Sequence, residues 1–339
     1  MSESDSFSRD YILASVAWCY AVRMRFFRSE SVSESWRRPC EITRLITAAL
    51  LLSLSGNAAA QARKAPAAAR SVRSWVVIQQ PARLVNGGPV AFRVKPPVAL
   101  KSLSAEWLKH DLDFTFDPRT KAWWAVGGVS LNTRPGSYAL VLKGTTKGSQ
   151  EISFERRFAV AAGKYRSISV QVAKKYTEPD PEQLRKIAAD KTVKQKTFEQ
   201  VSSEREWAGS FRAPVQAPVS DVFGTRRVFN GKVQSVHQGL DFAAPAGATI
   251  SAVNSGTVLL AQPLYFEGNC VVLDHGQGLL TIYMHLSQFA VHEGDHVQRG
   301  QALGLVGGTG RATGPHLHLA VRWQGEYLDP AILLGLRLP

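Results

Sequence analysis

Short segments of alternating or β-branched residues, separated by turn clusters, constrain the fold of this chain more than any other feature. Seven of them occur within residues 71–174: VRSWVVI, PVAFRV, LDFTFD, AWWAV, SYALVLK, ISFERRFAV and SISVQVA. Turn clusters such as NGG at 86–88 and RPG at 134–136 lie between them. Strands at this spacing, without helical periodicity, predict an antiparallel, immunoglobulin-like β-sandwich over residues 71–175. The likeness is architectural only, because the Cys–Trp–Cys pattern of immunoglobulin domains is absent.

Residues 176–211 change in character and predict a helical linker. Asp180 is a favourable N-cap, Pro181 suits the first helical position, and Gln183 stands three residues beyond the cap. The apolar stripe of this helix is thin and consists of Leu184, Ile187, Phe198 and Val201. We therefore expect it to pack lightly on one domain.

Residues 212–339 return to short β segments with many glycines and prolines and almost no helical pattern. Such a composition is typical of short strands joined by tight turns. The predicted fold class is therefore mainly β, with a C-terminal glycine-rich antiparallel domain preceded by the sandwich and the helical linker.

The net charge of +14 is concentrated in the middle of the chain. Residues 61–211 hold 26 Lys and Arg against 13 Asp and Glu, whereas residues 212–339 hold 8 of each. A neutral C-terminal third argues against a nucleic-acid partner. The basic middle fits peripheral attraction to an anionic wall, polymer or membrane surface. A solvated basic surface without a partner is the alternative.

Residues 1–62 predict a signal peptide with a long lead. Basic residues from 37 are followed by an apolar run at 45–54 and by small residues that allow cleavage after Ala60 or Ala62. Export to the periplasm or cell envelope is expected. The run is about half as long as the roughly 20 residues of a membrane helix, so a permanent anchor is the less favoured reading. A later start at Met24, and an anchoring segment at 12–22, stay open.

Seven of the eight histidines fall between 237 and 318. His237 and Asp241 are four residues apart, and Gly239 between them permits the bend that would bring the two side chains together. A hydrolytic zinc site needs about three His or carboxylate ligands, an open position, and a separate base or oxyanion partner. The two residues are candidates for such a site.

Three further histidines stand in informative positions. His316 and His318 are two apart in a predicted strand, so both would project from one face while Leu317 and Leu319 enter the core. His285 follows the apolar run LLTIY, at the end of another predicted strand. Spacing alone leaves open which of His316 and His318 would bind a metal.

Together these pieces resemble the lysostaphin-type, or LytM-like, zinc metalloendopeptidases, which cut peptide cross-bridges of bacterial peptidoglycan. The matching text, in order, is FGTRR, HQGLDFAAPAGATISA, SGTVLLA, VVLDHGQGLLTIYMHLS, VHEGDHVQRGQALGLVGGTGRATGPHLHLAVR and the tail YLDP. It covers about 120 residues, roughly 219–333. The resemblance implies a LytM-like domain over residues 212–339. The regions before it resemble, more weakly, accessory regions of exported Gram-negative proteins.

The resemblance also implies roles for the five residues. His237, Asp241 and His318 become the ligands of Zn²⁺. His285 and His316 become the catalytic pair that orients or deprotonates the attacking water and stabilises the oxyanion.

The remaining histidines and the C-terminal cysteine are predicted to be structural. His275 lies in a DHGQG turn, and His292 and His296 lie in a polar HEGDH hairpin whose glycine and spacing differ from the helical HExxH motif. Cys270 is expected to be a small buried residue of a strand. After cleavage of the signal it would be the one remaining cysteine, so no intrachain disulfide is expected.

The leading hypothesis is an exported zinc metalloendopeptidase that hydrolyses peptide bonds of peptidoglycan stem peptides or cross-links during cell-wall remodelling, with wall-remodelling proteins as further partners. One alternative is a non-enzymatic regulator of this fold that binds and activates other wall hydrolases. The presence of all five site residues favours the enzyme. A wall-binding module dominated by the sandwich, and self-inhibition by the linker or sandwich covering the groove, also stay open.

Overall fold

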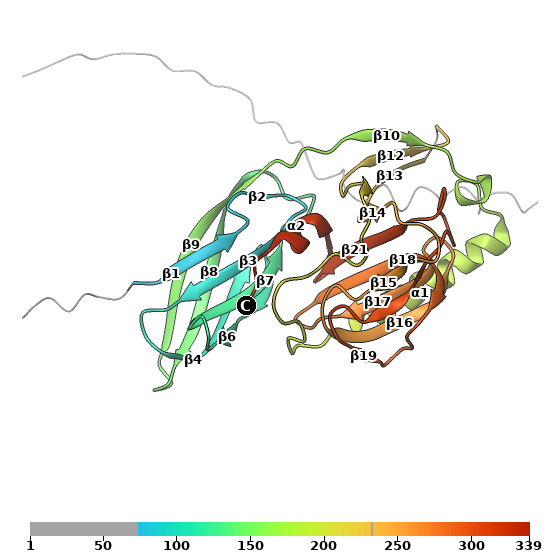
Figure 1. Ribbon diagram of the computed structural model, residues 1–339. Helices are drawn as coiled ribbons and strands as arrows, with labels where there is room; N and C mark the ends of the chain where they lie inside the picture. Colours follow the sequence, from blue (N-terminus) through green and yellow to red (C-terminus); the bar gives the residue numbers. More distant parts are fainter. Residues whose placement is uncertain (1–73, 232) are drawn as a thin grey trace, which may run out of the picture. The chain divides into compact units, whose positions relative to one another are not determined.

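The computed structural model describes residues 74–231 and 233–339, which belong to one compact unit of residues 68–339. The predicted signal peptide at 1–62 and the segment 12–22 lie outside the described residues. Strands dominate the described part, as the alternating segments predict (Figure 1). None of the helices in residues 74–231 and 233–339 combines the length and apolarity needed to cross a membrane.

Two sheets form the first half of this unit. The first has the order β1-β3-β7-β6, with bounds Val76–Gln80, Pro89–Lys95, Ala122–Gly128 and Thr115–Asp117. The second has the order β2-β9-β8-β4-β5, with bounds Leu84–Val85, Glu151–Ala161, Gly136–Thr146, Leu100–Trp107 and His110–Asp113. The ring of Phe92 on β3 lies 5.3 Å from Trp107 on β4 and 5.4 Å from Phe158 on β9, between centroids. Side chains of both sheets therefore meet in one core.

Several strands differ from the sequence prediction. Strand β2 was not predicted, and the single predicted segment LDFTFD forms parts of β5 and β6, which belong to different sheets. Strand β4 was not predicted, because a register shift between Leu100 and Ser102 interrupts the alternation of buried and exposed residues. The segment SISVQVA was predicted to belong to the sandwich. Instead, β10 (Ser167–Val170) pairs in parallel with β12 of the C-terminal half. Strand propensity shows that a segment is extended but does not select its partner.

The 3₁₀ turn η1 (Lys174–Tyr176) and helix α1 (Pro181–Glu199) follow. Asp180 accepts from the backbone N–H of Gln183, and the Gln183 side chain accepts from the backbone N–H of Asp180, which confirms the predicted helix start. Val193 and Phe198 pack against a small apolar cluster on the C-terminal sheet, whereas Leu184 remains exposed.

The C-terminal half is built on a large antiparallel sheet, as predicted (Figure 1). Its central path is β11-β14-β21-β18-β17-β16-β19, with bounds Val219–Asp221, Leu240–Phe242, Leu317–Trp323, Leu279–Phe289, Gly268–Asp274, Gly256–Leu264 and His296–Val297. Three more strands attach to it, and they are β15 (Thr249–Ser251), β20 (Ala302–Val306) and β22 (Glu326–Leu328). A small sheet, β10-β12-β13, combines β10 with Arg226–Phe229 and Val233–Val236, and helix α2 (Pro330–Gly335) follows β22.

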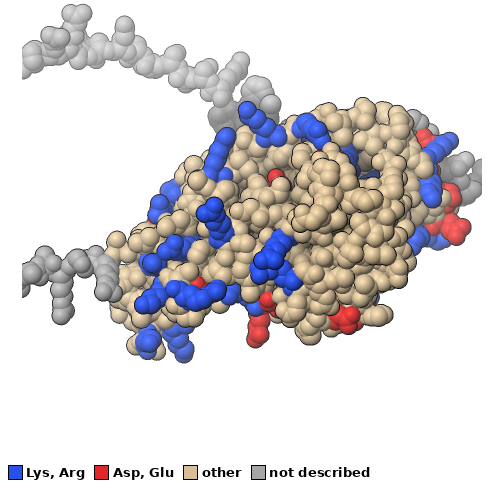
Figure 2. All heavy atoms as spheres, viewed as in Figure 1, with Lys and Arg blue, Asp and Glu red and all other residues tan. Residues whose placement is uncertain are grey.

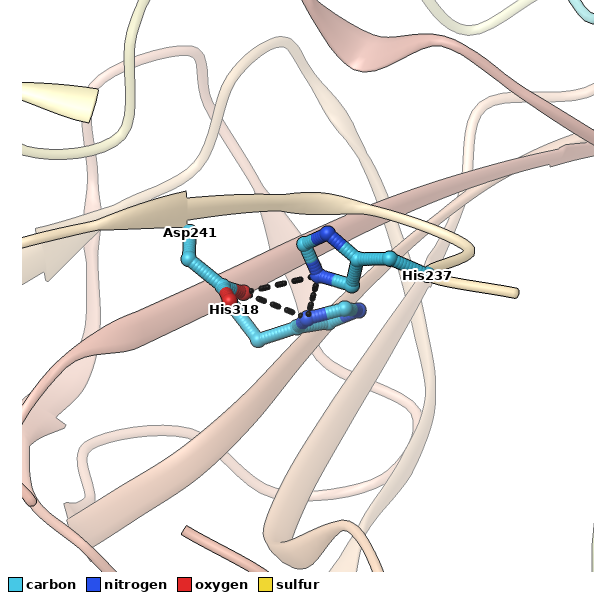
Figure 3. Close-up of side chains that lie close together, drawn as sticks. All are labelled: His237, Asp241 and His318. Carbon is cyan, nitrogen blue, oxygen red and sulfur yellow. Dashed lines mark hydrogen bonds and ion pairs between the residues drawn. The ribbon is translucent and has the colours of Figure 1, made fainter. Parts of the chain in front are cut away.

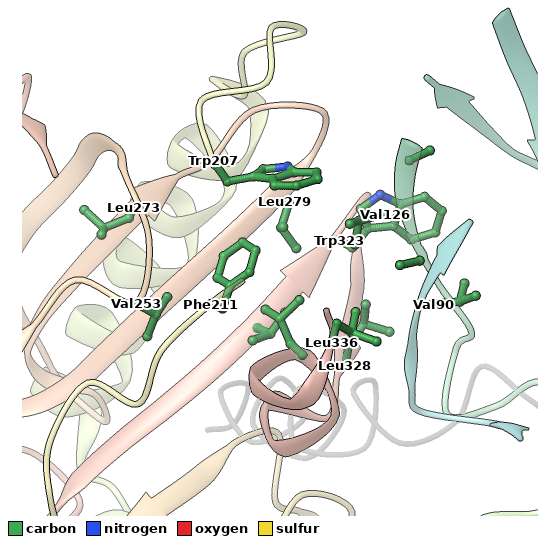
Figure 4. Packing of buried hydrophobic residues seen from close by; sticks show 14 of the residues in the cluster. Val90, Val126, Trp207, Phe211, Val253, Leu273, Leu279, Trp323, Leu328 and Leu336 are labelled. Atoms are coloured by element: carbon green, nitrogen blue, oxygen red, sulfur yellow. The ribbon is translucent and has the colours of Figure 1, made fainter. Parts of the chain in front are cut away.

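The apolar core continues from the first sheets into the C-terminal half (Figure 4). Val90 and Val126 come from the first sheet, while Trp323 and Leu328 come from the large sheet, and all belong to one cluster of buried residues. At Gly128 a Cβ atom would lie 2.7 Å from Leu328 and 2.9 Å from Trp323. The two halves are therefore in direct apolar contact.

Candidate metal centre and active site

Three side chains converge at the join of β14 and β21 (Figure 3). His237 directly follows β13, Asp241 lies on β14, and His318 lies opposite Asp241 on β21. His237 Nε2 lies 3.0 Å from Asp241 Oδ1 and 3.0 Å from His318 Nδ1, and the latter two atoms are 2.7 Å apart. All three residues are buried.

Close backbone approach makes this convergence feasible. A Cβ atom on Gly239 would lie 2.3 Å from His318 Nε2 and 2.5 Å from the carbonyl oxygen of Leu319. The sequence predicted a bend at Gly239. The structure shows that the missing side chain also leaves the space into which the His318 ring fits.

Outer contacts orient the three side chains. The His237 ring nitrogen Nδ1 lies 2.9 Å from the carbonyl oxygen of Val222, which can only accept, so Nδ1 carries the proton and Nε2 faces its two partners. Arg227 donates from Nη2 to Asp241 Oδ2 at 2.6 Å and to Asp221 at 2.5 Å. No role was predicted for Arg227. It is the second arginine of FGTRR, a segment that takes part in the family resemblance, and this was the one sign of it in the sequence.

Burial and pairing set the protonation of these groups. Burial by itself would raise the pKa of Asp241, but the imidazole rings of His237 and His318 in contact with its carboxylate outweigh burial and hold that pKa well below its usual range. Burial lowers the pKa of His318, against the attraction of Asp241. An ionised carboxylate and neutral imidazoles are the forms that bind metal ions.

His285 and His316 lie together beside this trio. Their ring centroids are 4.8 Å apart, and the His285 ring is 6.1 Å from the His318 ring. His285 was predicted at the end of a strand. Instead, β18 continues past it, and His285 occupies an irregularity with a φ of 68° that turns its side chain out of the strand alternation. Burial, followed by repulsion from His318 and His316, lowers the pKa of His285 to about 3.

Two cavities open next to the centre. The larger, of about 380 Å³, is lined by Asp241, His285 and His316 together with strand β10. The smaller, of about 180 Å³, is lined by His237, His285 and His318. Each side of the five-residue cluster therefore faces space that an extended ligand can enter.

The other predicted structural residues lie apart from this centre. His275 is fully buried, with ring nitrogens 2.7 Å from the carbonyl of Ser255 and 2.8 Å from Thr281 Oγ1. His296 lies 2.8 Å from Thr257 Oγ1, and His292 is exposed at the hairpin. Cys270 is buried on β17, and burial raises the pKa of its thiol.

Comparison with protein families gives one match: a model described as peptidase family M23 matches residues 235–330. Among curated proteins, the peptidoglycan DD-endopeptidase ShyA of Vibrio cholerae is 40% identical over 118 residues, which cover 34% of this chain and 27% of ShyA. The DD-carboxypeptidase/endopeptidase Mpg of Neisseria meningitidis is 38% identical over 116 residues, which cover 34% of this chain and 27% of Mpg. The chain thus spans about a quarter of the length of these relatives.

Among solved structures, the similarity can cover a longer stretch of this chain. A crystal structure of a peptidase M23 protein from Pseudomonas aeruginosa is 30% identical, with a TM-score of 0.56, and the likeness covers 75% of this chain and 96% of that one. The similarity therefore extends well beyond residues 235–330.

Proposed function

Because the chain belongs to peptidase family M23, we propose that it is an exported zinc metalloendopeptidase that hydrolyses peptide bonds of peptidoglycan. The observation that carries the proposal is the cluster of His237, Asp241 and His318 with a second pair of histidines at its edge. The curated relatives named as peptidoglycan endopeptidases support the substrate.

The three converging atoms fit zinc. One oxygen and two imidazole nitrogens are a donor set that zinc prefers, and tetrahedral bonds of about 2.0–2.1 Å place ligand atoms about 3.3 Å apart. The corresponding distances here are 2.7 to 3.0 Å, close to that spacing. Arg227 holds Asp241 Oδ2, which leaves Oδ1 for a metal. When bound, zinc would polarise the scissile carbonyl and acidify the attacking water.

The second pair supplies proton transfer. His285 Nδ1 lies 2.8 Å from the carbonyl oxygen of Thr309, so Nδ1–H donates and the neutral ring presents the lone pair of Nε2. That nitrogen is positioned to orient the attacking water or accept its proton, and to pass a proton to the leaving amine. His316 Nδ1 is fixed in the same way, 2.9 Å from the carbonyl oxygen of Gly314. In its protonated form His316 can donate from Nε2 to the oxyanion.

Export and surface attachment are further parts of the proposal. The signal pattern in residues 37–62 supports export, and the excess of positive charge in residues 61–211 supports peripheral attraction to an anionic wall or membrane. In Figure 2, Lys and Arg side chains are scattered over the part formed by β1 to β9, and the part formed by the large sheet is mostly uncharged in this view. Wall-remodelling proteins are proposed as partners on the basis of the substrate alone.

The experiment that tests the function is muropeptide release from purified sacculi by zinc-loaded protein that starts at residue 61. We expect release of uncrosslinked peptides by the intact protein, and none by a His318→Ala variant or after chelation. The masses of the products would identify the bond. No release by protein that binds zinc and is correctly folded would refute the enzyme and favour the non-enzymatic regulator.

A further inference from the structure

Four cationic side chains line the two cavities beside the candidate metal centre. Three of them have a carboxylate partner within 2.7 Å, and the pairs are Arg166–Asp221, Arg227–Asp221 and Lys194–Glu267. The fourth is Arg311, whose guanidinium makes no hydrogen bond or ion pair with any residue in 74–231 or 233–339. Arg311 is therefore the one cation in this group whose donors are available to a ligand.

Aromatic rings hold Arg311 in place. Its Cζ atom lies 4.7 Å from the ring centroid of Phe229 and 4.8 Å from that of Phe266. Its backbone N–H also donates to the carbonyl oxygen of Phe266 at 2.8 Å. Cation–π contact attracts the guanidinium to the ring faces but leaves its in-plane N–H groups unused.

The charge of Arg311 is incompletely compensated. Burial lowers its pKa, and Glu267 opposes this by attraction from a distance. A guanidinium nevertheless stays protonated in proteins, so a half-buried positive charge without a contacting anion remains. Burying such a charge is costly until an anion reaches it.

The position of Arg311 would also bring it into contact with a bound substrate. It lines both cavities, as His285 does. A peptide whose scissile bond lies between His285 and the metal centre would extend into these cavities, and so would pass beside the guanidinium.

We propose that Arg311 binds a free carboxylate that the peptide substrate carries near its scissile bond, and thereby selects substrates with that charge. The inference rests on the proposed function. A planar guanidinium matches a carboxylate with two parallel N–H···O bonds. Peptidoglycan stem peptides carry such carboxylates on their diamino acid and at their ends, and a carboxamide has nearly the same shape without the charge.

The test compares two forms of one probe. The probe is a dimer of stem peptides joined by a D-alanyl–diaminopimelate bond, with its diaminopimelate and terminal carboxylates either all free or all amidated. Binding is measured by calorimetry on the full zinc-loaded chain carrying His285→Ala, which slows turnover, with and without Arg311→Met. The matched control is Arg322→Met, because Arg322 also lies over a phenylalanine, 4.3 Å from the ring of Phe198, but lines neither cavity.

We expect the parent to bind the free acid roughly 10- to 100-fold more tightly than the amide, as a hydrogen-bonded charge pair allows. Arg311→Met should bind both forms within about threefold, and Arg322→Met should keep the preference. A preference that survives in Arg311→Met overturns the inference, and so does a parent that shows no preference or binds neither form.

Sacculus cleavage by the unaltered chain is scored separately, so that the two proposals can fail independently. Cleavage without a carboxylate preference would refute the role of Arg311 and leave the peptidase standing. A carboxylate preference that is lost in Arg311→Met, without any cleavage of sacculi, would support the role of Arg311 and refute the peptidase.

Discussion

Gly239 controls how closely two of the candidate ligands approach. Replacement by Ala would place a Cβ atom 2.3 Å from His318 Nε2, so the ring must move away from Asp241. We expect Gly239→Ala to weaken zinc binding at least about tenfold while the strands remain folded, because a displaced ligand loses well over 1 kcal/mol of contact. Competition with a chromophoric chelator measures the affinity. Gly335→Ala is the control, since nothing lies within 4 Å of its Cβ position; equal loss in both variants would contradict the argument.

His285 and His316 are expected to act on the reaction and not on metal retention. His285→Ala should lower kcat by about 10²- to 10⁴-fold, the usual contribution of a positioned acid or base. Bound zinc, measured by elemental analysis, should remain at one equivalent. The control is His296→Ala, whose side chain contacts Thr257 away from both cavities. Loss of zinc from His285→Ala would show that this residue is a ligand.

His275 should make the folded chain sensitive to mild acid. Burial lowers its pKa to about 4, against its hydrogen bond to the Ser255 carbonyl, whereas an unfolded histidine titrates near 6.5. Between these values the unfolded chain binds the proton more readily. Stability therefore falls as the pH drops from about 6.5 to about 4, by about 3 kcal/mol, with no further loss from this group below that range.

Urea unfolding at pH 7 and pH 4.5 checks this expectation. His275→Gln should lose less stability between the two pH values than the unaltered chain. Identical losses in the two proteins would assign the acid sensitivity to other groups.

At the scale of secondary-structure elements, helix α1 offers a direct test of its predicted start. Asp180 and Gln183 cap each other's backbone N–H groups. Asp180→Ala should cost about 1 kcal/mol and speed hydrogen exchange in the first turn of α1. Asp180→Ser restores a side-chain acceptor and should recover the protection. Exchange that is unchanged in Asp180→Ala would show that packing alone fixes this end.

The sequence was most informative where one local period dominates. The alternation correctly predicted that Leu317 and Leu319 of β21 face the apolar core, where they are 0% and 1% exposed, with His318 on the opposite face of the strand. It missed β4, because a bulge breaks the period, and it could not find the partner of β10, because that choice depends on contacts distant in sequence.

In the site, too, local patterns were predictable from the sequence and contacts between distant segments were not. Spacing identified the histidines, but the resemblance and not the spacing separated His318 from His316. The structure places His318 opposite Asp241 across a strand pair. The left-handed backbone of His285 and the ring contacts of Arg311 escaped prediction, since both depend on tertiary structure that no local pattern encodes.

At the scale of the whole described unit, the shared core predicts that residues 74–161 and the large sheet unfold together. Calorimetry should show one transition for the unaltered chain. Gly128→Ala inserts a methyl group against Leu328 and Trp323 and should cost about 1–3 kcal/mol. It should lower Tm by several degrees or separate the transition into two. Gly148→Ala is the control, because its Cβ would meet nothing closer than 3.9 Å; two transitions in the unaltered chain would contradict the prediction.

The same apolar contact limits how this chain can be recombined with others. A catalytic cassette cut out at residue 212 would expose Trp323 and Leu328, which are at most 1% exposed in the structure, and would tend to aggregate through that face. A chimera that places this C-terminal half on a foreign scaffold must therefore either carry β1 to β9 with it or replace the apolar residues of the uncovered face by polar ones.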